Sequence, residues 1–256
     1  MKPLPFRASC AALLALGATL LAPAAQAQIV DATDRGWHSQ SGIHVASNLN
    51  YLVGFSRTFV EVHRNWYVFG IPALGAGETF ATATLRVFNP TVNMGGFDGY
   101  QSPNLTEDYT LYDYTGAITT LRANRTNGGA TGQNIFSDLG TGQTYGNRTF
   151  SNSDNGTFSL ISLNAAALTA LNASAGSLFA LGGAVTTLSG QTAAEEAIFE
   201  STFAPDVPLS STQLILTSQQ GVAVPEASSF ALYIGAIVFG WGGRLCCRIR
   251  RLSRPE

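Results

Sequence analysis

Two groups of carboxylates have the residue type that glycoside cleavage requires. One combines Glu107–Asp108 with Asp113, and the other combines Glu195–Glu196 with Glu200. Glycosidases use two carboxylates, one as a general acid and one as a base or nucleophile. The first group lies beside tyrosines, so a polysaccharide-active hydrolase or lyase is one hypothesis for this chain. Solvated strand ends explain the same residues more simply, because the sequence does not give the distance between the carboxylates.

Other residues that could perform chemistry give weaker signals. The three histidines, His38, His44 and His63, lie near the N-terminus without the H-x-x-x-H or H-E-x-x-H spacing of a zinc site. No G-x-S-x-G motif is present. No D-x-D-x-D-G loop supports calcium, although a structural calcium ion held by carboxylates and loop carbonyls is an alternative. We therefore expect no catalytic residue, no metal site and no required cofactor.

Aromatic residues are better material for a binding site, because flat rings stack on sugar rings. The set comprises Trp37, Trp66, Tyr67, Tyr100, Tyr109, Tyr112 and Tyr114. Strand alternation predicts that about half of them fill a core instead. Tyr112 and Tyr114 share one face of a strand, and Tyr109 points to the other. Tyr112, Tyr114 and Trp66 are therefore our candidates for glycan contact.

The elements that position these residues are predicted to be short strands. Runs of β-branched and aromatic residues occur at 43–55, 64–69, 82–88, 109–114, 157–163 and 213–217. Turn signals such as Asn127-Gly128 and Asn155-Gly156 separate them. One short helix is expected from Asn164 to Leu171, with Asn164 as its cap and alanines that favour it. The pattern predicts an all-β sandwich with one short helix.

The N-terminus is predicted to be a secretory signal peptide, residues 1–27. Lys2 and Arg7 form a charged start, and an apolar run follows from Ala11 to Ala22. Small residues at Ala25 and Ala27 fit a signal peptidase, so we place the cleavage between Ala27 and Gln28. Signal peptidase is therefore one expected partner.

The C-terminus, residues 219–256, contains a linker and three consecutive features. Val224, Pro225 and Glu226 form a short motif, and an apolar helix is expected at about 228–243. A basic tail fills 244–256, with Arg244, Arg248, Arg250, Arg251 and Arg254. Positive charge keeps a tail in the cytoplasm, so the body between the two ends is expected outside.

This order resembles the PEP-CTERM sorting signal of Gram-negative bacteria, which exosortase recognises. The family usually reads Pro-Glu-Pro, whereas Ala227 replaces the second proline here. The resemblance implies exosortase as a partner and the inner membrane as a transient anchor. It also implies a final location at the cell surface or in the extracellular matrix. A plain single-span anchor is the alternative.

The body, residues 28–218, is acidic and free of cysteine. It contains no lysine, and Cys10, Cys246 and Cys247 all lie outside it. A thiol enzyme and a cysteine-ligated metal are thereby excluded from the body. Its acidic balance argues against nucleic acid, which requires basic patches.

The stretches Arg64–Phe69 and Ala83–Val87 resemble those of jelly-roll β-sandwich domains related to carbohydrate-binding modules. This resemblance implies a jelly-roll-like fold but no function. We expect a non-enzymatic surface or exopolysaccharide-matrix protein with a structural or interaction role. A carbohydrate-binding module without catalysis and a polysaccharide-active enzyme are the two alternatives.

Overall fold

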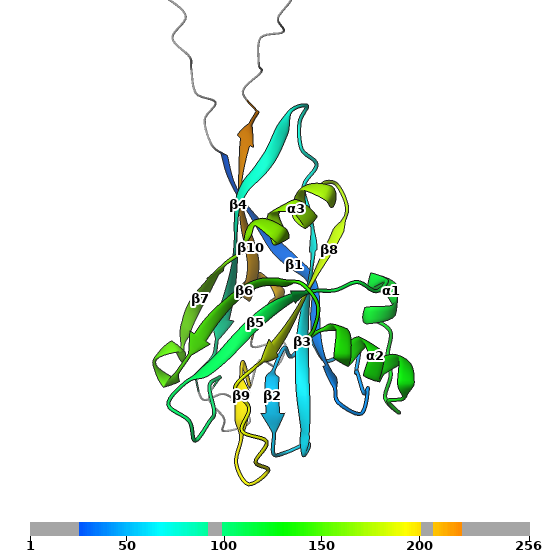
Figure 1. Ribbon diagram of the computed structural model, residues 1–256, viewed down its shortest axis with the longest axis vertical. Coiled ribbons are helices and arrows are strands. Elements are labelled where there is room, and N and C mark those ends of the chain that lie inside the picture. The colour runs from blue at the N-terminus through cyan, green and yellow to red at the C-terminus, as the bar shows by residue number, and fades with distance from the viewer. Residues whose placement is uncertain (1–25, 92–98, 201–206, 222–256) are drawn as a thin grey trace, which may run out of the picture. The chain divides into compact units, whose positions relative to one another are not determined.

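The structure, a computed structural model, describes residues 26–91, 99–200 and 207–221 (Figure 1). The sorting motif Val224–Glu226, the expected apolar helix and the basic tail lie outside these residues, as do residues 1–25 of the expected signal peptide. The described strands are β1 Gln26–Ser39, β2 Val53–Ser56, β3 Glu61–Gly70, β4 Glu78–Asn89, β5 Glu107–Asp113, β6 Thr144–Phe150, β7 Thr157–Ser162, β8 Leu178–Val185, β9 Glu196–Ile198 and β10 Thr212–Gln220. The helices are α1 Ile118–Leu121, α2 Ala130–Asp138 and α3 Ala165–Ala173, with 3-10 turns η1 Asn152–Asp154 and η2 Leu209–Ser211.

The strands form one antiparallel sheet, so the expected all-β class is confirmed. Its main path runs β6-β5-β8-β3-β1-β10-β4-β7, and β2 joins β9 to β3. The long strand β1 connects the two halves, since residues 26–31 pair with β10 and the residues from Ala32 onward pair with β3, with a bulge at Thr33. The two end strands come close together, because Asn164, just after β7, donates its N–H to the Tyr145 carbonyl of β6 at 2.8 Å. The sheet is therefore nearly closed and barrel-shaped (Figure 1).

β4 shows why these sequences form strands around one core. Phe80, Ala83, Leu85 and Val87 are buried, while the intervening threonines and Arg86 are more exposed. Such period-two alternation places one face of the strand in the core. The buried residues join a cluster that includes Tyr67, Tyr109 and Leu214 from other strands.

β3 is buried on both faces, which defines where the helices pack. Tyr67 and Phe69 face the main core, whereas Trp66 and Val68 form a second cluster on the opposite face. Leu121 of α1, Ile135 of α2 and the nearby Leu139 complete this second cluster. The two helices therefore cover the outside of the sheet at β3 and β8 (Figure 1).

The helix at Asn164 is confirmed, but the expectation of a single helix is wrong. Asn164 caps α3 by accepting the N–H of Ala167 at 3.0 Å. The sequence did not predict α2, whose Thr131, Gly132 and Asn134 have low helix propensity. Packing stabilises it instead, since a Cβ on Gly132 would lie 2.0 Å from the Gly42 carbonyl oxygen.

Most predicted strands are present, with differences at their ends. Residues 64–69, 82–88 and 213–217 lie within β3, β4 and β10, whereas the strand predicted at 43–55 begins only at Val53. Upstream of it, His44 forms an isolated bridge to Arg125. The sequence pattern did not predict strands at the positions of β1, β6, β8 or β9.

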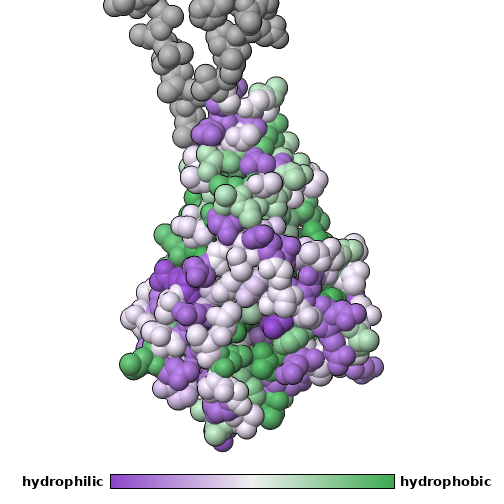
Figure 2. All heavy atoms as spheres, viewed as in Figure 1, coloured by the Kyte–Doolittle hydropathy of each residue, from purple (hydrophilic) through white to green (hydrophobic). Residues whose placement is uncertain are grey.

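The surface in view is largely polar or neutral. Smaller hydrophobic areas lie toward the end that carries β2 and β9 (Figure 2). Phe59 and Val60, in the turn between β2 and β3, are 49% and 67% exposed. Within the described ranges, none of the helices has the length and apolar character needed to cross a membrane.

Candidate functional site

The carboxylates of the first predicted group do not meet. Glu107 is buried and accepts hydrogen bonds from Ser102 Oγ at 2.6 Å, from Asn104 Nδ2 at 2.8 Å and from the Thr187 hydroxyl. Asp108 points to solvent and accepts from Thr149 Oγ1 at 2.6 Å. Asp113 accepts the N–H of Gln143 at 2.8 Å. Each carboxylate stabilises a different loop or strand, which gives it a structural role in the fold.

The second group separates into two parts. Glu196 is buried and binds Ser189 through the backbone N–H at 2.8 Å and through the hydroxyl. Glu195 and Glu200 come together, and burial followed by the charge of Glu195 raises the pKa of the Glu200 carboxyl from 4.5 to about 8.

A pocket of about 400 Å³ has Glu195 in its wall. It is lined by Arg57, Thr58, Gln101, Ala194 and Glu195. The N–H of Arg57 donates to Glu195 Oε2 at 2.8 Å, which fixes one carboxylate at the pocket wall.

The three histidines are packing residues. All are buried, and the rings of His38 and His44 stack with their centroids 4.7 Å apart. His63 packs edge-on against Trp37 at 4.8 Å. Burial lowers the pKa of His38 and His63 from 6.5 to about 4, and it also lowers the pKa of His44. Among the described residues no cluster of three metal-ligating side chains occurs.

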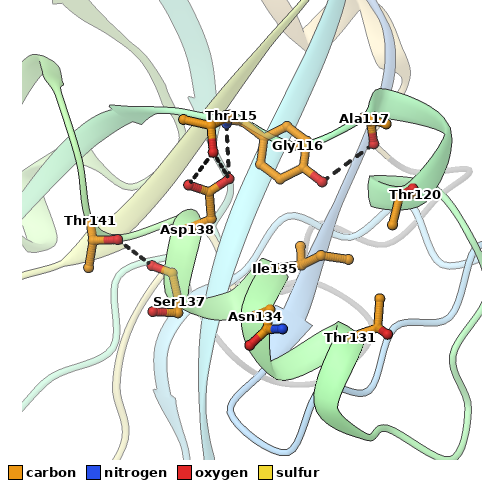
Figure 3. A pocket seen from close by; sticks show the side chains of 11 residues that line it. Thr115, Gly116, Ala117, Thr120, Thr131, Asn134, Ile135, Ser137, Asp138 and Thr141 are labelled. Carbon is orange, nitrogen blue, oxygen red and sulfur yellow. Dashed lines mark hydrogen bonds between the residues drawn. The ribbon is translucent and has the colours of Figure 1, made fainter.

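A larger open pocket of about 480 Å³ lies where β5 ends beside α1 and α2 (Figure 3). Its polar lining combines one carboxylate, one amide and several hydroxyl groups over the apolar side chain of Ile135. The lining residues are Tyr114, Thr115, Gly116, Ala117, Thr120, Thr131, Asn134, Ile135, Ser137, Asp138 and Thr141.

Asp138 is held in a fixed orientation at the edge of this pocket. Thr115 donates its backbone N–H to Asp138 Oδ2 at 2.9 Å and its hydroxyl to both carboxylate oxygens at 3.1 Å (Figure 3). Thr141 Oγ1 donates to the Ser137 carbonyl at 2.9 Å, which secures the chain after α2. The loop after β5 and the end of α2 are thus joined through one carboxylate.

Tyr114 supplies the aromatic ring of the pocket. It is half-buried, and its hydroxyl donates to the Ala117 carbonyl at 3.4 Å. Burial, and after it the charge of Asp138, raises the pKa of its hydroxyl. The ring lies against Gly116, because a Cβ there would come within 2.7 Å of Tyr114 Cζ. Gly116 therefore leaves the space that the ring occupies.

The other predicted glycan contacts lie elsewhere. Tyr112 is half-buried on β5 and is not part of the pocket lining. Trp66 is only 1% exposed, because α1 and α2 cover it, so the expectation that it contacts glycan is corrected. Ala27 and Gln28, the expected cleavage position, pair in β1 with Thr217 and Leu216 of β10.

The residues of the pocket other than Tyr114 were missed in the sequence. Asp138, Asn134 and Ser137 come from α2, which has no strong local signal. Thr115 belongs to a loop, and only the tertiary fold places it beside Asp138. The signal that could have found the site is the proximity of Tyr114 to several small polar residues in sequence.

No protein-family model matches the sequence, and no curated protein matches it either.

Proposed function

We propose that this protein is exported, sorted by exosortase to the cell surface or exopolysaccharide matrix, and binds glycan there without catalysis. The observation that carries the binding proposal is the pocket in which Tyr114 stands beside the anchored carboxylate of Asp138. Sugars present hydroxyl groups and apolar ring faces. A ring, a carboxylate, an amide and several hydroxyls in one shallow pocket match both kinds of group.

Two features support binding rather than cleavage. Asp138 is the single carboxylate among the described residues that line this pocket, whereas glycosidases use two. Its oxygens already accept the backbone N–H of Thr115 and share the hydroxyl hydrogen of the same residue. A carboxylate held in this way suits orientation of a ligand more than proton transfer.

The export proposal rests on the two ends of the chain and on the body between them. The charged start, the apolar run and Ala25-Gln26-Ala27 support signal peptidase cleavage, and Val224-Pro225-Glu226 with its basic tail supports exosortase sorting. A body without cysteine needs no disulfide outside the cell. The curled sheet around its main core also supports a relationship to jelly-roll-like sandwiches.

Affinity electrophoresis in gels that contain the host's exopolysaccharide tests the binding proposal. We expect the exported protein to be retarded and the Tyr114→Ala variant to migrate as in a gel without polysaccharide. Tyr112→Ala is the matched control, since Tyr112 lies on β5 outside the pocket lining, and should be retarded like the wild type. Equal retardation of the Tyr114→Ala variant would contradict the proposal.

Intact-mass analysis of the exported protein tests the sorting proposal separately. The expected species begins at Gln28 and lacks the residues after the sorting motif. A species that still carries residues 227–256 would contradict processing by exosortase and favour a plain anchor.

A hydrolase or lyase is the second candidate, favoured by the Glu195–Glu200 pair, of which Glu195 lines a pocket. This activity would release reducing sugar, or unsaturated sugar in the case of a lyase, from the host polysaccharide. Loss of that product in Glu200→Gln, with Glu107→Gln as a buried control on β5, would support it. No product release from any polysaccharide of the host would exclude it.

A further inference from the structure

The outward side of β1, β10, β4 and β7 carries exposed apolar side chains. Ile29 is 65% exposed, Leu160 is 52% exposed and Phe158 is 40% exposed. Their strand neighbours Val30 and Ile161 point inward and join or contact the core. We call the outward residues of these strands the outer face; they are Ile29, Asp31, Gln213, Ile215, Thr84, Arg86, Phe88, Phe158, Leu160 and Ser162.

Strand register orders the outer face into rows. One row runs Ile29, Ile215, Thr84 and Ser162 across the four strands. The next row runs Asp31, Gln213, Arg86 and Leu160. Opposite charges therefore stand on the two sides of β10, at the same level along the strands.

Hydrogen bonds fix both charges in place. Gln213 donates its Nε2 to Asp31 Oδ1 at 2.7 Å and accepts from Arg86 Nη1 at 2.6 Å. The Arg86 guanidinium also lies over the Phe158 ring, 3.3 Å from its centroid. Charges that are already ordered lose little side-chain entropy when they meet a partner.

This arrangement is self-complementary. Neighbouring strands lie about 4.8 Å apart, so Asp31 and Arg86 are equally far from β10. A two-fold axis along β10, in the plane between two facing sheets, would bring each Asp31 opposite Arg86 of a second copy. The same axis brings Ile215 against its own counterpart. We propose that the outer face is the contact between two copies of this chain, in an isologous, face-to-face dimer.

The size of the outer face sets the expected strength. Four strands and three to four rows cover roughly 400–600 Å² on each copy, below the roughly 800 Å² per partner of a standard stable interface. The dimer should therefore be weak, with a Kd of about 10–300 µM. Such an affinity suits a protein concentrated on a surface or in a matrix. The inference does not depend on glycan binding, because the outer face and the Tyr114 pocket share no residue.

Sedimentation velocity of the exported protein between about 5 and 500 µM tests this proposal. The wild type should shift from monomer to dimer, whereas Asp31→Arg alone and Arg86→Asp alone should weaken the dimer at least about tenfold by placing like charges opposite each other. An equimolar mixture of the two variants should dimerise again, because each introduced charge then meets an opposite one. Asp108→Arg, an exposed charge reversal on β5, is the matched control and should behave as the wild type.

Three results would overturn the proposal: a wild type that stays monomeric, single variants that dimerise like the wild type, or a mixture that stays monomeric. Thermal unfolding checks that each variant is folded. If Arg86→Asp is destabilised through its lost Phe158 contact, Ile29→Glu provides a second variant at a well-exposed position, and it should also abolish the dimer.

Discussion

Thr115 binds Asp138 through two groups, its backbone N–H at 2.9 Å and its hydroxyl at 3.1 Å. These bonds join the loop after β5 to the last residue of α2. The loop and the helix end form two walls of the candidate pocket, and this contact holds them together. Tyr114, the residue just before Thr115, is thereby held at the opening.

The Thr115→Val variant should loosen this contact without removing the carboxylate. The variant loses the hydroxyl contacts and keeps the backbone hydrogen bond. We expect the free energy of unfolding to fall by at most about 1 kcal/mol, because water can replace the lost contacts at this exposed site. Urea unfolding measures the stability. Thr119→Val, on α1 and outside the pocket lining, is the control, and an equal loss there would contradict the specific role of Thr115.

Gly116→Ala should displace the Tyr114 ring. A Cβ at position 116 would lie 2.5 Å from the Tyr114 hydroxyl oxygen, so the ring must move out of the pocket. We expect glycan affinity to fall about tenfold, which corresponds to about 1.4 kcal/mol. The control is Gly70→Ala, where the nearest atom to a new Cβ is 3.8 Å away. Unchanged glycan affinity in the Gly116→Ala variant would show that the position of the Tyr114 ring does not affect binding.

The buried histidines should make the fold acid-sensitive. The pKa values of His38 and His63 in the folded protein are about 4, below the ordinary 6.5, so the unfolded chain binds more protons as pH falls. Their contribution to stability is complete above pH 6.5 and is lost progressively as pH drops toward 4. One pKa unit corresponds to about 1.4 kcal/mol, so each residue contributes up to about 3 kcal/mol to this loss.

Urea unfolding at pH 8, 6 and 4.5 measures this effect. His63→Phe, which keeps an aromatic ring beside Trp37 and Phe59, should show a smaller fall in stability than the wild type. Identical pH profiles for both proteins would contradict the assignment to His63.

Glu200 should act in the opposite pH range. Its folded pKa of about 8 lies above the ordinary 4.5, so its contribution to stability is complete below pH 4.5 and is lost as pH rises through 8. Glu200→Gln removes the charge that forms at high pH and should stabilise the protein by a few kcal/mol at pH 9 relative to pH 5. The exposed Asp108→Asn serves as control. A Glu200→Gln variant that tracks the wild type at both pH values would show that the pair is not proton-linked.

Local signals in the sequence predicted the elements that local physics stabilises. Asn164 and the alanines after it define α3, and the alternation from Thr82 to Phe88 defines the exposed and buried faces of β4. β1 was not predicted because Asp31, Asp34 and Gly36 interrupt its apolar pattern, and pairing on both sides stabilises it instead.

The candidate site depends on tertiary structure, and of the residues predicted to contact glycan only Tyr114 lines the pocket. Trp66 has the residue type of a sugar contact, but α2 covers it, and α2 itself depends on packing against that same cluster. Asp138 gains its place only when the end of α2 meets Thr115. Glu195 and Glu200 meet across β9, where Phe199 adopts a positive φ of 57° that redirects the chain.

Titration calorimetry of the exported protein with the host's exopolysaccharide is the most direct test of the central claim. The account predicts that the wild type and Tyr112→Ala bind with similar affinity, and that Tyr114→Ala binds at least about tenfold more weakly. Wild-type affinity in Tyr114→Ala, or a loss confined to Tyr112→Ala, would contradict a glycan site in the pocket between β5, α1 and α2.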